Sequence, residues 1–298
     1  MSHAQRQFIT LDVFTQQRFG GNPLAIVPDA DGLDDRTMQQ IAAEANLSET
    51  VFIHRSAGSS IPQLRIFTPK SELPFAGHPT VGTAIYLAET SGVEDTGLLT
   101  LQTRAGEVTA RITRSREGLT QAEITAPKSP EARPAASVEA CAAAISLQES
   151  DIASAPLICD AGNPFTVIPL ASRDALSRAR LDAAAWAAGL AKGEAPKLFL
   201  VHVDPGEAGK VIHARMFAPS IGIAEDPATG SAAVALPALL RERQAMQDGE
   251  HHWQIHQGVD MGRPSLMQLR AVVKDGKVVS SHVGGTAVRV ISGTLSLS

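Results

Sequence analysis

Two segments of the sequence combine an ionisable residue with proline and glycine in a pattern suited to binding a small anion. They are residues 74–82, Pro-Phe-Ala-Gly-His-Pro-Thr-Val-Gly, and residues 224–231, Ala-Glu-Asp-Pro-Ala-Thr-Gly-Ser. Proline is favoured at the first position of a helix, so each segment predicts a helix start, with His78 or Asp226 as the cap residue before it. Backbone N–H groups at a helix start attract a carboxylate, and Gly77 and Gly230 would allow it to approach closely.

Glu49 is the third candidate, and it lies between a predicted helix and a predicted strand in residues 46–50, Asn-Leu-Ser-Glu-Thr. A carboxylate can move a proton between carbon atoms when burial raises its pKa towards the working pH. A lone glutamate at such a junction is more often solvated, and either helix start alone is more often an ordinary cap. The pairing of His78 with Asp226 favours chemistry, because a duplicated cap has no structural reason to become a histidine in one copy and an aspartate in the other.

The chain contains a diverged copy of itself, and this duplication relates the candidate residues to one another. Residues 21–28, Gly-Asn-Pro-Leu-Ala-Ile-Val-Pro, recur as residues 162–169, Gly-Asn-Pro-Phe-Thr-Val-Ile-Pro, at a shift of 162 − 21 = 141. Three further matches follow in the same order at shifts of 148 to 150: residues 51–54 with 199–202, 65–69 with 215–219, and 79–84 with 227–232. A shift of 148 aligns His78 with Asp226 and Glu49 with Lys197, so the two halves differ at both positions.

Each half mixes short strands with helices, which predicts an α+β fold of two domains, each with a sheet around an alanine-rich helix. A first helix is expected to be capped by Asp34 or Asp35 and to end at Asn46. A second is expected to run from Pro79 to about residue 90. In the second half a helix is expected over residues 181–191, and Pro237 should kink or end the second central helix.

The predicted boundary between the halves lies in the stretch 129–137, which is rich in proline and alanine and is the expected linker. The first domain would then comprise residues 1–128 and the second residues 129–298. The Gly284-Gly285 pair predicts a turn before the last strand. That strand could return to the first domain, an alternative that the sequence leaves open.

Composition excludes several classes of function. The chain has 298 residues, a formal net charge of -5 and no long basic run, so we expect no binding to nucleic acid. No apolar stretch is long enough to span a membrane, and the N-terminus has no apolar run, so a cytoplasmic protein is expected. Cys141 and Cys159 lie in no metal-binding spacing, and His251, His252 and His256 lack a carboxylate or cysteine to complete a site. We therefore expect no metal.

At these motifs the sequence resembles the PhzF-like proteins of phenazine biosynthesis, which share the diaminopimelate epimerase fold. The resemblance covers essentially the whole chain and rests on residues 19–23, 46–50, 72–80, 225–232 and 257–265. It implies two pseudo-symmetric domains, each a curved mixed sheet wrapped around a central helix, with the active site between them. It also implies that the family's catalytic glutamate is Glu49, and that its active-site histidine, aspartate and serine are His78, Asp226 and Ser231. Family members are typically homodimers, and the best-studied one isomerises a dihydro-hydroxyanthranilate without a cofactor.

The expected function is therefore that of a cofactor-independent isomerase that moves a proton on a small carboxylate, with Glu49 as the acid and base and Gly77 and Gly230 at the substrate. An epimerase or racemase of an amino-acid derivative is an alternative, but epimerases of this fold use one cysteine from each half. Glycines occupy those positions here, and both cysteines lie elsewhere. The other alternative is a non-catalytic carboxylate-binding protein. Glu49 distinguishes it, because a pure anion site gains nothing from a second carboxylate.

Overall fold

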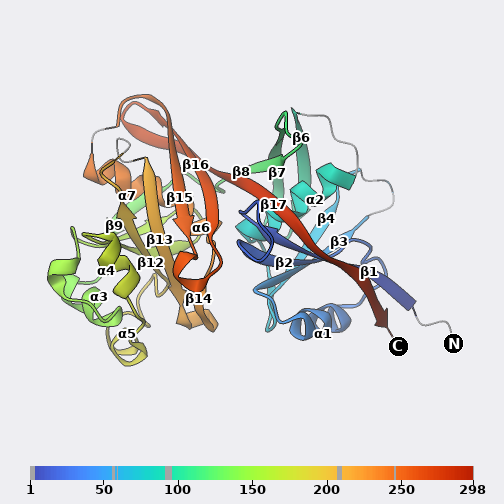
Figure 1. Ribbon diagram of the computed structural model, residues 1–298, viewed down its shortest axis with the longest axis horizontal. Coiled ribbons are helices and arrows are strands. Elements are labelled where there is room, and N and C mark those ends of the chain that lie inside the picture. Colours follow the sequence, from blue (N-terminus) through green and yellow to red (C-terminus); the bar gives the residue numbers. More distant parts are fainter. Residues whose placement is uncertain are drawn as a thin grey trace. The chain divides into compact units, whose positions relative to one another are not determined.

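The computed structural model describes residues 4–55, 58, 60–90, 96–206, 210–244 and 246–297. The chain divides into two compact units, Met1–Ile124 with Gly284–Ser298, and Thr125–Val283. In the chain, the first unit gives way to the second between Ile124 and Thr125, four residues before the expected boundary between residues 128 and 129. The C-terminal part of the last strand belongs to the first unit, where it pairs with the first strand (Figure 1).

In its described residues, the first unit is a mixed sheet with two helices. Its strands are β1 (Ala4–Val13), β2 (Asn22–Val27), β3 (Glu49–His54), β4 (Gln63–Phe67), β5 (Glu72–Leu73), β6 (Thr96–Thr103), β7 (Gly106–Arg114), β8 (Thr120–Thr125) and the C-terminal part of β17 (Lys277–Leu297). Strand β2 pairs antiparallel with β1 and parallel with β3, β4 pairs antiparallel with β3 and β5 and parallel with β6, and β6 pairs antiparallel with β7.

The second unit repeats this order of pairings. Its strands are β9 (Glu131–Pro134), β10 (Leu157–Asp160), β11 (Pro164–Pro169), β12 (Leu198–Val203), β13 (Val211–Ala218), β14 (Ile223–Asp226), β15 (Gly249–Gln257) and β16 (Ser265–Lys274). Strand β11 pairs antiparallel with β10 and parallel with β12, β13 pairs antiparallel with β12 and β14 and parallel with β15, and β15 pairs antiparallel with β16. The stretch expected to be a linker contains β9, which pairs with β10, so that expectation is wrong for residues 131–134.

Helix α1 (Asp35–Ala45) forms as the sequence predicts. The side chain of Asp34 accepts a hydrogen bond from the backbone N–H of Thr37, and Asn46 ends the helix in the left-handed conformation with φ of 49°. Its apolar side covers the sheet, and Phe52 and Phe67 beneath it meet edge to face with ring centres 5.4 Å apart.

Helix α2 (Gly77–Thr90) is the central helix of the first unit, and its residues are buried from Gly77 to Ala88. A helix that is apolar all round must lie inside the fold. In the second unit the counterpart is interrupted, because α6 (Gly230–Ala233) is followed by α7 (Leu236–Arg243). Pro237 lies in the first turn of α7, so the helix breaks where the proline predicts a kink or an end.

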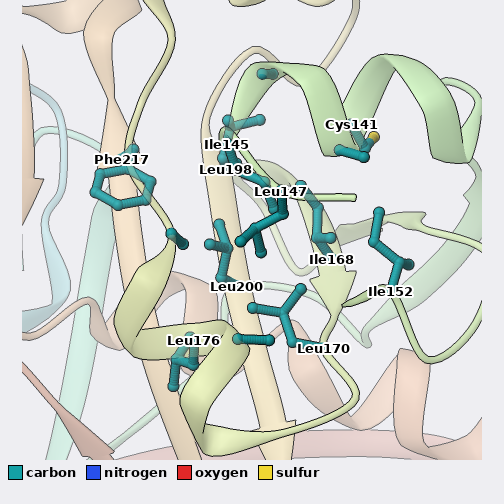
Figure 2. Close-up of a cluster of buried hydrophobic side chains, with 14 of the residues drawn as sticks. Cys141, Ile145, Leu147, Ile152, Ile168, Leu170, Leu176, Leu198, Leu200 and Phe217 are labelled. Carbon is teal, nitrogen blue, oxygen red and sulfur yellow. The ribbon is translucent and has the colours of Figure 1, made fainter. Parts of the chain in front are cut away.

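The other α-helices in the described part of the second unit pack against its strands β11, β12 and β13. They are α3 (Val138–Ala144), α4 (Arg173–Arg178) and α5 (Ala183–Gly189). Figure 2 shows their core, in which Ile145 and Leu147 after α3 meet Leu198 and Leu200 of β12. Cys141 belongs to the same cluster and is fully buried. The helix expected over residues 181–191 is α5, capped by Asp182.

A paired arginine and glutamate holds the corresponding hairpin of each unit. Arg65 on β4 donates two hydrogen bonds to Glu72 on β5, at 2.7 and 2.6 Å. Arg215 on β13 does the same to Glu225 on β14, at 2.8 Å each. Each guanidinium also stacks over the phenylalanine two residues later, 5.2 and 5.1 Å from the ring centres. Because the two strands β5 and β14 run towards α2 and α6, these pairs fix the approach to both central helices.

The Gly284-Gly285 pair does not form the expected turn, because β17 continues through it. The strand passes so close to β8 that a Cβ atom on Gly284 would lie 2.7 Å from the carbonyl oxygen of Ala122. Glycine is needed there for close approach of two strands rather than for a reversal of the chain. Among the described residues no helix has both the length and the apolar character needed to cross a membrane.

We expect Arg215→Met to lower the free energy of unfolding by about 3 kcal/mol or more, because it leaves a mostly buried Glu225 carboxylate without its cation. The substitution also removes donors from the carbonyls of Leu176, Ser177 and Ala179. Urea unfolding of the purified variant measures the change. Arg178→Met is the matched control, since Arg178 is half-exposed in its ion pairs and should lose less than about 1 kcal/mol. Equal losses for the two variants would contradict the proposed role of the buried pair.

Candidate active site

Glu49 is the first residue of β3 and follows directly on the loop that leaves α1. It lies opposite Leu24 in the parallel pairing of β2 with β3, and its side chain is only 13% exposed. Its Oε2 atom lies 3.4 Å from Nδ1 of His78 on α2. The first unit therefore brings together the two ionisable residues that the sequence singles out in it.

His78 is the second residue of α2 and not the cap residue before it, so the expected helix start at Pro79 is displaced by two residues. The hydrogen bond from the N–H of Thr80 to the carbonyl of Ala76 closes the first turn. Burial lowers the pKa of His78 to about 3, and a weaker interaction with the Pro23 carbonyl opposes the shift. With its pKa lowered in this way the imidazole is neutral at neutral pH, so one ring nitrogen can donate a hydrogen bond and the other can accept one.

The start of β2 brings Pro23 to His78, and the segment before it is held by close contacts. The N–H of Phe19 donates to the buried carboxylate of Asp12 at 2.6 Å. Gly21 has φ of 62°, and a Cβ atom there would lie 2.4 Å from the carbonyl oxygen of Val13. Only glycine fits both the conformation and the space. The motif at residues 19–23 therefore has a packing role beside the site, which its sequence alone did not reveal.

Asp226 is the last residue of β14, and it does not cap a helix. Helix α6 begins four residues later at Gly230, after Thr229, so the expected helix start at Pro227 is wrong. Asp226 is 7% exposed, and its carboxylate accepts a hydrogen bond of 2.6 Å from the Thr229 hydroxyl. The Asp226 side chain, which was expected to cap a helix, therefore stabilises the turn between β14 and α6.

Gln257 at the end of β15 holds the same turn, a role that the sequence did not reveal. Its Nε2 donates to the Asp226 carbonyl at 2.7 Å and to the Thr229 hydroxyl at 2.9 Å, and its Oε1 accepts from the Thr229 N–H at 3.1 Å. The side chain is fully buried with its polar atoms bonded, so it contributes rigidity without an unsatisfied group. The signal was present in the sequence, because residues 257–265 carry part of the resemblance.

Ser231 is the second residue of α6, next to Gly230. Its hydroxyl lies 3.4 Å from Nδ2 of Asn163, and Oδ1 of Asn163 accepts a hydrogen bond from the Lys197 ammonium. Asn163 and Lys197 are the repeat counterparts of Asn22 and Glu49. The two units thus correspond at both positions. Each has an asparagine directly after the glycine of its turn, and a charged residue at or just before the start of the following strand, β3 or β12. The charges are of opposite sign.

The two cysteines are both free and buried in the second unit. Burial raises the pKa of Cys141 to about 11 and that of Cys159 to about 12, so neither is a thiolate at neutral pH. Neither thiol is therefore poised to act as a base. In the described part of the chain, no group of three or more His, Cys, Asp or Glu residues could hold a metal ion.

Comparison with known sequences gives matches along nearly the whole chain. The family model described as phenazine biosynthesis-like protein, PhzC-PhzF, matches residues 11–293. An uncharacterized isomerase of Mesorhizobium japonicum is 40% identical, over 97% of this chain and 98% of its own. The trans-2,3-dihydro-3-hydroxyanthranilate isomerase of Pseudomonas chlororaphis is 34% identical, over 97% of this chain and 99% of its own.

Solved structures agree with this assignment. The phenazine biosynthesis protein of the PhzF family from Bacillus anthracis superposes with a TM-score of 0.88 at 27% identity, covering 98% of this chain and 99% of that one. A hydroxyproline epimerase from Agrobacterium vitis, at 13% identity and a TM-score of 0.65 over 98% of this chain and 93% of its own, shares the fold. The expected α+β fold of the epimerase type is confirmed. The chain is an isomerase that belongs to the phenazine biosynthesis-like family, PhzC-PhzF.

Proposed function

We propose that this isomerase moves a proton between two carbon atoms of a small carboxylate, without a cofactor, and that Glu49 carries the proton. The observation that supports the proposal is the contact between Glu49 and His78, two mostly buried side chains 3.4 Å apart. A carboxylate in such a position can accept a proton from carbon only if the substrate stabilises the electron pair left behind. A conjugated carboxylic acid with an allylic C–H does so.

The step balances without any other reagent. Glu49 accepts the proton from one carbon, the electron pair moves into the neighbouring double bonds, and the protonated Glu49 returns the proton to another carbon on the same face. The neutral imidazole of His78 can hydrogen-bond to the carboxyl group without holding it permanently in the ionised form, as a cationic imidazolium would. The substrate named for the Pseudomonas chlororaphis relative, trans-2,3-dihydro-3-hydroxyanthranilate, has this chemistry and is the first candidate substrate.

The groups of the second unit are proposed to bind the same substrate. Asp226 would contact a polar substituent, and the Ser231 hydroxyl and the N–H groups of Gly77 and Gly230 would contact the carboxylate. Their rigid surroundings support this proposal, because the turn that carries Asp226 is tied to Gln257 and Thr229. A homodimer and a cytoplasmic location, both expected from the sequence, remain predictions.

Racemisation or epimerisation by two thiols does not fit the chain. Both cysteines are buried in the second unit, and burial raises the pKa of each thiol well above neutrality. A binding protein without activity would not explain a mostly buried glutamate beside a buried histidine, since burying such groups lowers stability.

We expect Glu49→Gln to lower the turnover of trans-2,3-dihydro-3-hydroxyanthranilate by about 10²–10⁴-fold or more, because glutamine keeps the shape but cannot carry the proton. Substrate affinity should change little. Steady-state kinetics and the incorporation of deuterium from D₂O into carbon positions of the product measure both the rate and the proton transfer.

Glu44→Gln is the matched control, because Glu44 is an exposed carboxylate on α1 close in sequence to Glu49. It should leave turnover at the wild-type level. Melting temperatures of both variants show whether the fold is retained. A folded Glu49→Gln variant with near wild-type turnover would exclude the single-glutamate mechanism.

We also expect the neutral His78 to make stability depend on pH. The pKa of His78 is about 3 in the folded chain against 6.5 for an ordinary histidine. Between these values the unfolded chain binds more protons, so the free energy of unfolding falls as the pH falls from about 6.5 towards 3. The slope is up to about 1.4 kcal/mol per pH unit. Urea unfolding at several pH values should show that His78→Gln loses this part of the slope.

His213 contributes a slope of the same sign, because burial lowers its pKa to about 4, so the measured quantity is the difference between wild type and variant. His252→Gln, at an exposed histidine, is the control and should keep the wild-type slope. If His78→Gln keeps it as well, His78 is not held neutral, and an ion pair with Glu49 would have to be considered instead.

A further inference from the structure

Lys197 lies just before β12, at the position that corresponds to Glu49 in the first unit. Its ammonium donates to Oδ1 of Asn163 and lies 4.4 Å from the ring centre of Phe165. The side chain is partly buried within the second unit. A position that only filled space would take an apolar residue there at lower desolvation cost, so the ammonium has another use.

The ammonium determines which way the Asn163 amide points. An ammonium group has donors only, so the amide must turn its oxygen to Lys197 and its NH₂ group to the other side. On that side Nδ2 lies 3.4 Å from Oγ of Ser231. In this orientation the serine oxygen can accept from Asn163, which leaves the serine's own proton for a different acceptor.

We propose that Lys197 and Asn163 are positioning residues that fix the Ser231 hydroxyl as a hydrogen-bond donor to an oxygen of the substrate's carboxylate. The proposal rests on the proposed function, in which Ser231 contacts the substrate. Neither Lys197 nor Asn163 needs to contact the substrate. They act through the serine, and the chain of donors runs from the ammonium through the amide to the hydroxyl.

The charge on Lys197 maintains this direction. Burial lowers the pKa of Lys197 to about 8, and the carboxylate of Asp160 on β10 opposes the shift. Asp160 is itself paired with Lys128 at 2.8 Å and lies 4.0 Å from Arg133 on β9. Above pH 8 the neutral amine can accept as well as donate, so the amide is free to turn over and the serine proton is no longer directed outward.

The direct test observes the Asn163 amide by ¹⁵N NMR, independent of activity. Its side-chain NH₂ resonances, assigned by their loss in Asn163→Asp, should shift in Lys197→Met and in Ser231→Ala. Lys192→Met, at an exposed lysine five residues away, should leave them unchanged. Unchanged amide resonances in a folded Lys197→Met variant would overturn the proposal, whatever the enzyme's substrate.

Kinetics with trans-2,3-dihydro-3-hydroxyanthranilate then test the role of the arrangement. One hydrogen bond to a charged group corresponds to about a tenfold change, and it is made in both ground and transition states. Lys197→Met and Asn163→Asp should therefore each raise KM about tenfold with kcat little changed, and wild-type KM should rise above pH 8.

In the Ser231→Ala background both substitutions should have no further effect on KM, because the hydroxyl that they orient is gone. An effect of equal size in that background would show that they act by charge or by stability, and would overturn the proposal. If the wild-type enzyme does not turn over this compound, the proposed function fails on its own, while the amide resonances still decide whether Lys197 orients Asn163.

Discussion

The bidentate pair of an arginine and a glutamate is the interaction on which the geometry of each unit depends. Arg65 with Glu72, and Arg215 with Glu225, join two strands at the point where the chain turns from the sheet to the central helix. Two parallel N–H···O bonds fix both distance and orientation, which a lysine could not do. Burying a charge lowers stability unless the charge is paired. A shift in the register of either hairpin would separate its arginine from its glutamate, so each pair also favours one register.

On this shared frame the two units have diverged in the residues that carry protons. Glu49 starts a strand in the first unit, and Lys197 lies just before the equivalent strand in the second. His78 is the second residue of the first central helix, and Asp226 ends the strand before the second. A duplication keeps the backbone positions and leaves the side chains free to change, so a symmetrical scaffold can hold groups of opposite charge. The difference between the two units at these corresponding positions therefore indicates function more clearly than any one of the four residues does alone.

The sequence predicted the elements that depend on local signals. The duplication, helix α1 with its caps at Asp34 and Asn46, and the break near Pro237 all follow from periodicity, capping and the geometry of proline. The resemblance identified the motif that includes Gln257, but its role could not be read from the sequence. That role depends on a contact with Thr229, 28 residues earlier in the chain.

The errors arose where tertiary contacts overrode a local rule. Proline is favoured at the first helical position, yet α2 begins two residues before Pro79, and α6 begins three residues after Pro227. In the second unit, hydrogen bonds from Thr229 and Gln257 hold Asp226 at the end of a strand instead. The glycine pair at residues 284 and 285 indicated a turn, but close strand packing also requires glycine, and sequence alone does not separate these two needs.

The neutral state of His78 has a consequence for the kind of chemistry that the first unit can support. Burial disfavours the imidazolium, so it opposes a proton on His78 unless a neighbouring group supplies compensating negative charge. A carboxylate that gains a proton becomes a neutral acid, and it becomes an anion again when it loses the proton. Neither state is a buried cation. The proposed transfer of one proton from carbon to Glu49 and back to carbon meets this condition. The burial that lowers the pKa of His78 therefore agrees with the proposed isomerisation, in which no buried cation forms.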